Sequence, residues 1–370
     1  MITTSRRSLL GALAGTIAVS SLGGIAAPAV ARAQTRPYWP TFGWRESLPV
    51  EVGLDSAIFD EVTAQIQSDS PSLSGLAVAY GGNIVYEYYA DGFDPYKPID
   101  IWSSTKSITG TTIGVAIWEG LLSEDSTIGE VMPDRIPPEA DPVVADITVR
   151  NLLTMRSGWL WDGTVDYANL DNAADWAART LTLPMQAAPG EVFTYNSGNT
   201  HILSCMLQAA SGMTLRDYAQ DRVFSHMGVD IHDWRESDQG ESAGGWGLHI
   251  TVREMVKFGY LMLNNGQWDG QQLVPDWWVA DATAFQSDST GLNDFGFGTG
   301  YGYTWWRADL AGYPSYFALG YGESVIYVVP GLDLVIAAAT DVVPAFDNPG
   351  AQSRPQPVIR RTLIPAVAGE

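Results

Sequence analysis

Apolar and polar positions alternate with a period of two residues near both ends of the chain. The early run covers residues 75–89 and is interrupted by Gly81-Gly82-Asn83, which predicts a β-hairpin because glycine supplies the positive φ of a tight turn. Four later runs have the same period and predict strands: 301–306, 316–319, 324–329 and 332–338.

Between these runs the apolar positions recur at helical spacing. Asp55 is expected to cap a first helix that ends near Gln67. Further helices are predicted over 147–155, 172–181, 198–211, 214–225, 251–264, 275–284 and 357–367. The pattern predicts an α+β fold in which one antiparallel sheet is built from both chain ends and flanked by helices. The sheet part spans about 50–100 and 295–370, and a mostly helical lobe of about 101–294 is inserted, with a site expected in the cleft between them.

The first residues are predicted to direct export. Ser5-Arg6-Arg7 precedes a small, mildly apolar run that ends at Ala31-Arg32-Ala33, which resembles a bacterial twin-arginine signal with its cleavage site. Residues 1–33 are therefore predicted to be a signal peptide, and 34–370 the mature domain. The mature protein is expected in the periplasm or outside the cell, with no stable membrane insertion.

Composition narrows the possible partners. The 370 residues are 46% hydrophobic, which is ample for a large core, and 42 acidic against 20 basic residues give a formal net charge of −22. Such a charge disfavours nucleic acid and anionic membranes as partners and leaves a small molecule as the expected one. The single cysteine, Cys205, excludes an intramolecular disulfide and is expected to be buried, and the four histidines show no metal-ligand spacing.

A serine and a lysine lie three residues apart in Ser103-Ser104-Thr105-Lys106, at the start of a run that predicts a buried helix. That spacing puts both side chains on one helical face. A serine hydroxyl becomes a strong nucleophile when a base removes its proton, and lysine is such a base once burial lowers its pKa. The alternative is an ordinary Ser/Thr helix cap with a surface lysine.

Two later stretches carry candidate partners. Tyr195, on the loop before a predicted helix, can exchange a proton with the serine or with a leaving group. The glycine-rich stretch 318–324 follows a predicted strand, and an N–H of Gly322 or Glu323 is expected to form an oxyanion hole with the N–H of Ser103. Taken singly, the tyrosine is more typical of a half-buried aromatic, and the glycines of an edge bulge.

In this order, Ser103-x-x-Lys106, Tyr195-Asn196-Ser197 and the glycine-rich late strand resemble the serine β-lactamase and penicillin-binding-protein superfamily. The likeness is closest to class C β-lactamase-like serine hydrolases, which include 6-aminohexanoate-dimer hydrolase and related esterases. It covers about residues 50–365, and further stretches support it: 147–158, 244–251 and 264–275.

The resemblance implies a β-lactamase/transpeptidase-like fold and a role for each motif residue. Ser103 is the acylated nucleophile, Lys106 the base that activates it, and Tyr195 the proton relay to the leaving group. No metal and no organic cofactor is implied.

The chain departs from the superfamily pattern at two points. The late strand carries Gly320-Tyr321-Gly322-Glu323 where β-lactamases and D-alanyl-D-alanine peptidases have a cationic triplet that binds the substrate carboxylate. The tyrosine motif is Tyr-Asn-Ser rather than Tyr-Ser-Asn, which leaves open which side chain positions the substrate amide, and Ser197 is one candidate for this role. Candidate pocket residues are Trp159, Trp161, Asp162, Trp246, Tyr301 and Tyr321, of which Asp162 would hold a substrate ammonium.

These observations predict an exported, cofactor-free serine hydrolase that cleaves a neutral or amino-bearing amide or ester through an acyl-enzyme, as a monomer or homodimer. Two alternatives remain open at this point. One is a β-lactamase or D-alanyl-D-alanine carboxypeptidase, and the other is a non-catalytic penicillin-binding-like sensor.

Overall fold

A computed structural model describes residues 36–163, 165–289, 298–342 and 355–369. The predicted signal peptide, residues 1–33, lies outside the described residues. Within the described part of the chain, no helix combines the length and the apolar character needed to cross a membrane.

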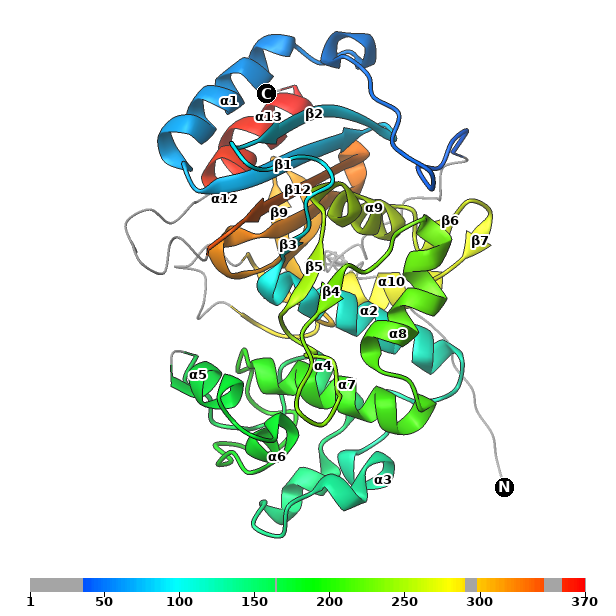
Figure 1. Ribbon diagram of the computed structural model, residues 1–370, viewed down its shortest axis with the longest axis vertical. Helices are drawn as coiled ribbons and strands as arrows, with labels where there is room; N and C mark the ends of the chain where they lie inside the picture. The colour runs from blue at the N-terminus through cyan, green and yellow to red at the C-terminus, as the bar shows by residue number, and fades with distance from the viewer. Residues whose placement is uncertain (1–35, 164, 290–297, 343–354, 370) are drawn as a thin grey trace, which may run out of the picture. The chain divides into compact units, whose positions relative to one another are not determined.

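One seven-stranded sheet lies at the centre of the fold (Figure 1). Its strands, in spatial order, are β2 (Asn83–Tyr89), β1 (Leu73–Tyr80), β12 (Leu334–Thr340), β11 (Val325–Val329), β10 (Tyr313–Leu319), β9 (Trp306–Leu310) and β8 (Gly300–Tyr301). Every neighbouring pair is antiparallel. The pairing of β1 with β12, from Leu73–Thr340 to Tyr80–Leu334, joins the two ends of the chain inside the sheet.

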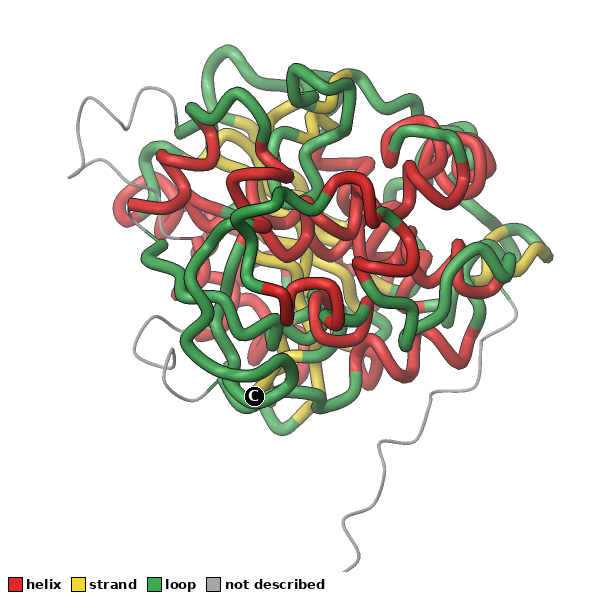
Figure 2. Tube along the Cα trace, turned by 90° about the horizontal axis from the view of Figure 1, so that it is seen from below, coloured by secondary structure: helices red, strands yellow, loops and turns green. Residues whose placement is uncertain are grey.

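Successive side chains of these strands belong alternately to two apolar clusters. Leu76 and Val78 of β1 belong to one apolar cluster, while Ala77 and Ala79 belong to the other. Because successive side chains of a strand point to opposite faces, both faces of the sheet are buried. Helices therefore cover both faces of the sheet. In the view of Figure 2 the strands run through the middle with helices around them.

One face is covered by the terminal helices α1 (Ser56–Asp69), α12 (Pro355–Val358) and α13 (Ile364–Ala368). On the other face α9 (Val252–Leu263) packs against β1, β11 and β12. The remaining helices are α2 (Thr105–Trp118), α3 (Ile128–Val131), α4 (Val149–Leu153), α5 (Val165–Asp171), α6 (Trp176–Leu181), α7 (Ser197–Ser211), α8 (Leu215–Ala219) and α10 (Asp276–Thr283). Short strands complete the fold: β3 (Ile99–Asp100), β4 (Asp233–Trp234) and β5 (Leu248–Ile250) form one small sheet, and β6 (Gln267–Trp268) and β7 (Gln271–Gln272) another.

Most predicted elements are confirmed. Asp55 caps α1 by accepting a hydrogen bond from Ala57 N at 2.9 Å, and the β1–β2 turn uses Gly81 and Gly82 at φ 58° and 84°. The prediction of a single strand over 301–306 was wrong. Thr304 has φ 62°, and this left-handed residue breaks the run into β8 and β9.

Two predicted helices are shorter than their apolar patterns. The helix expected over 172–181 begins at Trp176, because the Asp175 side chain caps it by accepting the Ala178 N–H at 2.8 Å. The helix expected over 214–225 keeps α-helical bonding only to Ala219 and continues as a π-helical turn over Gln220–Phe224.

Candidate active site

Ser103 lies in a short 3₁₀ turn (Trp102–Ser104) immediately before α2. The residue before it, Trp102, has φ 51°, a conformation that bulky side chains rarely adopt. This left-handed residue turns the chain sharply from β3 into α2, and Ser103 is left half-buried at the corner. Strain at a position next to a nucleophile is typical of functional sites.

Hydroxyl groups on this turn and helix fix the surrounding loops. The helix α2 is buried from Thr105 to Ala116, so its polar side chains need partners inside the protein. Ser104 Oγ donates to Ser324 O at 2.8 Å, and Thr109 Oγ1 donates to Gly244 O at 2.7 Å. The late glycine-rich loop and the loop at Gly244 are thereby attached to the element that carries Ser103.

Lys106 is the group best placed to activate the serine. Its side chain is fully buried, and its Nζ lies 2.7 Å from Ser103 Oγ and donates to Gly245 O at 3.0 Å. Burial lowers the pKa of Lys106 to about 7. Among the described residues no carboxylate lies within 4.0 Å of Nζ to stabilise the ammonium form. Near neutral pH a large fraction of Lys106 is therefore a neutral amine that can accept the serine proton.

Tyr195 completes this cluster from the loop just before α7. Its hydroxyl lies close enough to Ser103 to influence the pKa of the phenol, and Lys106 Nζ lies 5.0 Å from the centre of its ring. Burial raises the pKa of Tyr195 well above its usual value, although the Ser103 side chain partly offsets this. The phenol is thus neutral, which favours the predicted role of proton donor to a leaving group over that of a phenolate base.

The late loop approaches the serine at Gly320. A Cβ at this position would lie 2.3 Å from Ile101 O and 3.1 Å from Ser103 N, so only glycine allows the two backbones to meet. Gly322 faces Val342 instead, and the Glu323 carboxylate accepts the Gln356 N–H at 3.0 Å. These contacts favour the N–H directly after Gly320 as the second oxyanion donor. A role for the N–H of Gly322 or Glu323 stays a prediction.

The two residues after Tyr195 are the ones between which the sequence motif left the substrate-positioning role open. Ser197 is buried in the first turn of α7. Asn196 caps this helix, with Oδ1 accepting from Gly198 N at 2.6 Å, while its buried Nδ2 has no hydrogen-bond partner within the described part of the chain. Asn196 thus both caps the helix and offers a buried donor beside Tyr195, so the choice between Asn196 and Ser197 for positioning the substrate stays open.

The predicted pocket residues fall in different surroundings. Tyr321 is 46% exposed and its ring meets that of Trp102 edge-on at 5.5 Å, so it lies beside the serine turn. Trp161 is half-buried against the core, and Asp162 is exposed and accepts the Val165 N–H at 3.4 Å at the start of α5. Binding roles for Trp161 and Asp162 stay predictions. Three further aromatic candidates, Trp159, Trp246 and Tyr301, are buried core residues.

Folding also brings together a cluster that sequence spacing did not indicate. His201, Cys205 and Glu241 are buried, and their donor atoms lie within 4.8 Å of one another. Glu241 is paired with Arg135 and accepts from Ser237 Oγ at 3.1 Å, and burial lowers the pKa of His201 to about 4. The partly exposed Arg135 guanidinium already pairs with the Glu241 carboxylate, so this cluster is explained as an ion pair with His201 and Cys205 packed beside it.

Comparison with known proteins agrees with this geometry. The family model described as Beta-lactamase matches residues 58–353. The chain belongs to the Beta-lactamase family. This membership and the Ser103–Lys106–Tyr195 arrangement identify it as a serine hydrolase of that family with a β-lactamase/transpeptidase-like fold.

Three proteins that are similar to this chain illustrate its place in the family. The 6-aminohexanoate-dimer hydrolase of Paenarthrobacter ureafaciens is 25% identical over 247 residues, which is 62% of this chain and 62% of that protein. Penicillin-binding protein 4 of Amycolatopsis lactamdurans is 26% identical over 273 residues, or 65% of this chain and 71% of the other. A D-stereospecific amidohydrolase structure from Streptomyces sp. superposes with a TM-score of 0.65 at 16% identity, covering 83% of this chain and 98% of that one.

Proposed function

We propose that this Beta-lactamase-family protein hydrolyses amide or ester bonds of a small substrate through an acyl-enzyme on Ser103. The observation that carries the proposal is the 2.7 Å distance between Ser103 Oγ and the Nζ of a fully buried lysine. Desolvation makes the amine a base near neutral pH, and the serine is the only group it can deprotonate at that distance among the hydrogen-bond partners described for Lys106.

The proposed reaction has two halves. Lys106 takes the Ser103 proton while Oγ bonds to the substrate carbonyl carbon, and the N–H of Ser103 with the backbone after Gly320 stabilises the oxyanion. The bond to the leaving amine or alcohol then breaks as Tyr195 gives this group a proton, and the Lys106 ammonium passes its proton to the Tyr195 oxygen, so that both residues regain their starting forms. Water next attacks the ester carbonyl while the neutral Lys106 amine accepts its proton. The bond between the acyl carbon and Ser103 Oγ then breaks, Lys106 gives the proton to Oγ, and the acid is released.

The names of the relatives support an amide or ester substrate rather than a β-lactam. One relative is named for the 6-aminohexanoate dimer and one structural neighbour for amide hydrolysis. The stretch Gly320-Tyr321-Gly322-Glu323 also supplies no cation for a substrate carboxylate. We therefore rank an amidase or esterase first, and a β-lactamase or D-alanyl-D-alanine carboxypeptidase second.

The test compares three substrates on the mature protein: p-nitrophenyl butyrate, nitrocefin and the linear 6-aminohexanoate dimer. We expect turnover of the ester or the dimer, with a transient acyl adduct on Ser103 in intact-protein mass spectra. Ser103→Ala should abolish turnover, and Lys106→Ala and Tyr195→Phe should each slow it by about 10²–10⁴-fold, the range for a lost general base or acid.

Other outcomes separate the alternatives. Nitrocefin turnover or a long-lived penicilloyl adduct favours the β-lactamase or peptidase function. Full activity in Ser103→Ala contradicts the assignment of the nucleophile. A folded protein that forms no adduct with any of the three compounds would favour a non-catalytic sensor.

We also propose that the protein is exported in bacteria through the twin-arginine route, on the basis of Arg6-Arg7 and Ala31-Arg32-Ala33. The expected outcome is a secreted or periplasmic form whose N-terminus, determined by mass spectrometry, is Gln34. Replacing Arg6-Arg7 by two lysines should retain the precursor inside the cell.

A further inference from the structure

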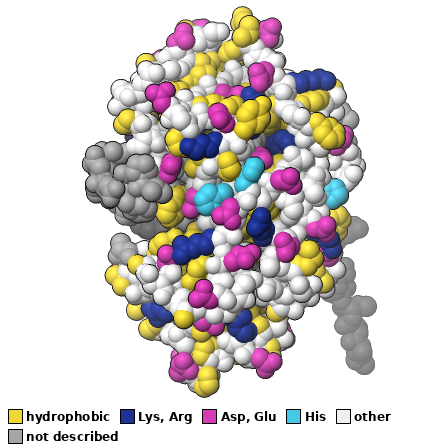
Figure 3. All heavy atoms as spheres, in the orientation of Figure 1, with side chains coloured by type: hydrophobic (Ala, Val, Ile, Leu, Met, Phe, Trp, Pro, Cys, Tyr) yellow, Lys and Arg dark blue, Asp and Glu magenta, His cyan; other side chains and the backbone are white. Residues whose placement is uncertain are grey.

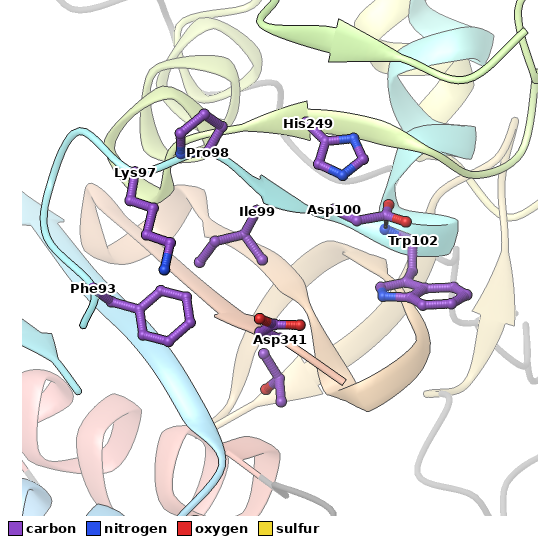
Figure 4. Close-up of a pocket in the computed structure, with 9 residues that line it drawn as sticks. Phe93, Lys97, Pro98, Ile99, Asp100, Trp102, His249 and Asp341 are labelled. Carbon is purple, nitrogen blue, oxygen red and sulfur yellow. Dashed lines mark hydrogen bonds between the residues drawn. The ribbon is translucent and has the colours of Figure 1, made fainter. Parts of the chain in front are cut away.

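A cavity of about 280 Å³ lies next to the serine turn (Figure 4). The side chains that characterise it are Phe93, Lys97, Asp100, Trp102, His249 and Asp341. In Figure 4, Phe93 and Lys97 lie at one end, Asp100, Trp102 and His249 at the other, and Asp341 between them. None of these six residues takes part in the proton transfers proposed above.

Trp102 places this cavity beside the nucleophile. It lines the cavity and directly precedes Ser103 in the chain, and its ring meets Tyr321 edge-on beside Gly320. Asp100 accepts the Trp102 N–H at 2.8 Å and so joins the cavity wall to the serine turn. Ser103 itself does not line the cavity, so a substrate whose carbonyl carbon reaches Ser103 would enter the cavity by extending a short flexible arm past Trp102.

Two carboxylates of the lining can attract a positive group, although Lys97 and His249 also line the cavity. Asp100 at the end of β3 and Asp341 after β12 bring two carboxylates to the cavity from opposite ends of the chain. Aromatic rings border both of its ends, and the face of such a ring attracts a cation. The formal net charge of −22 adds a long-range attraction of the same sign.

The one lysine of the lining indicates how an ammonium is held here. Lys97 Nζ lies 4.0 Å from the centre of the Phe93 ring and donates to Gly92 O at 2.9 Å. The protein thus already places one ammonium against an aromatic wall of this cavity. Because Lys97 is exposed and held by its own loop, it occupies the rim and leaves the Trp102 end to a ligand.

We propose that this cavity binds an ammonium group of the substrate, held by Asp341 and Asp100 against Trp102. The inference deepens the proposed function and rests on it, because it selects amides and esters that carry an amine a few methylene groups away from the scissile carbonyl. It replaces Asp162 as the ammonium partner with residues that line a cavity beside Ser103.

The test uses two p-nitrophenyl esters of equal chain length, 6-aminohexanoate and hexanoate. Asp341→Asn should lower kcat/KM for the amino ester by about tenfold and leave the hexanoate ester within about twofold, because only the amino ester loses a charge partner. Asp341→Glu should retain the preference. Lys97→Gln removes a positive charge from the cavity and should therefore raise kcat/KM for the amino ester, whereas Asp341→Asn lowers it.

Asp309→Asn is the matched control. Asp309 is an exposed carboxylate on β9 outside the cavity, so this variant loses the same charge elsewhere and should leave both esters unaffected. Unchanged hexanoate turnover in Asp341→Asn shows that the variant is folded. An equal effect of Asp341→Asn on both esters, or no effect on either, would overturn the ammonium site while the hydrolase function stands.

A binding measurement separates failure of the site from failure of the proposed function. n-Hexylammonium should bind the wild-type protein in calorimetry, and more weakly after Asp341→Asn, whether or not any ester is turned over. If neither ester is hydrolysed, the proposed function fails but this titration still tests the cavity. Equal binding of n-hexylammonium by the wild-type and Asp341→Asn proteins would contradict the inference.

Discussion

Two buried lysines in this protein show why only one of them can act as a base. Burial lowers the pKa of both Lys106 and Lys257. Lys257 Nζ donates to three carbonyl oxygens, those of Thr41, Met227 and Gly228, at 3.0 to 3.2 Å, so all three of its N–H bonds are satisfied in the charged form. Lys106 has one carbonyl acceptor and the serine, which leaves room for a neutral amine with its lone pair toward Oγ.

A pH profile follows from this difference. Only the neutral form of Lys106 can accept the serine proton, and its pKa is lowered to about 7. We expect kcat/KM for p-nitrophenyl butyrate to fall about tenfold per pH unit below 7 and to level off above it. Lys106→Arg should not restore activity, because a guanidinium is not deprotonated in proteins. A flat profile between pH 5 and 9 would argue against Lys106 as the base.

At the scale of elements, the turn before α2 depends on the end of β10. Gly320→Ala would place a methyl group 2.3 Å from Ile101 O, a contact with backbone that a side-chain movement cannot relieve. We expect kcat to fall by about 10²-fold or more, as for loss of an oxyanion donor, because Ser103 N and the backbone after Gly320 move apart. The measurement is kcat together with the midpoint of thermal unfolding.

Gly312→Ala supplies the comparison for that variant. Gly312 lies in the turn between β9 and β10, has φ 75° and has open space around it. The substitution should cost about 1 kcal/mol of stability through backbone conformation alone and leave kcat unchanged. Equal losses of kcat in both variants would mean that the effect of Gly320→Ala is one of general stability.

Elements whose apolar residues recur at a regular spacing could be predicted from the sequence. Features that depend on the backbone conformation of one residue could not. The alternation in β1 and β12 and the Gly81-Gly82 turn follow from side-chain order and glycine chemistry. The break at Thr304 does not, because threonine rarely adopts φ 62° and only tertiary contacts select it there.

At the scale of the whole molecule, the fold decides which residues meet. The Ser103–Lys106 spacing is local, so the sequence predicted it. Three features of the site join segments that lie over a hundred residues apart. The Gly245 carbonyl accepts a hydrogen bond from Lys106, Gly320 approaches Ser103, and Asp100 and Asp341 line the same cavity. Sequence periodicity contains no signal for such meetings, because it describes one element at a time.

Net charge is the property of the whole molecule that bears most directly on substrate choice. Acidic side chains are spread over the face shown in Figure 3 rather than gathered in one patch, so their attraction for a cation acts at long range and is screened by salt. We expect kcat/KM for the p-nitrophenyl ester of 6-aminohexanoate to fall as sodium chloride rises from about 0.01 to 0.5 M, over which the Debye length shrinks from about 30 Å to a few ångströms. The hexanoate ester should be nearly insensitive to salt.

The Asp341→Asn variant separates this global attraction from the local site. It changes the formal net charge only from −22 to −21, so its salt dependence should match that of the wild-type protein. Its kcat/KM for the amino ester should nevertheless lie about tenfold lower at every salt concentration, since a partly buried contact is screened far less than the surface field. If the variant lost the salt dependence together with the preference, the attraction would come from Asp341 alone. If both esters responded equally to salt, the charge of the protein would play no part in choosing its substrate.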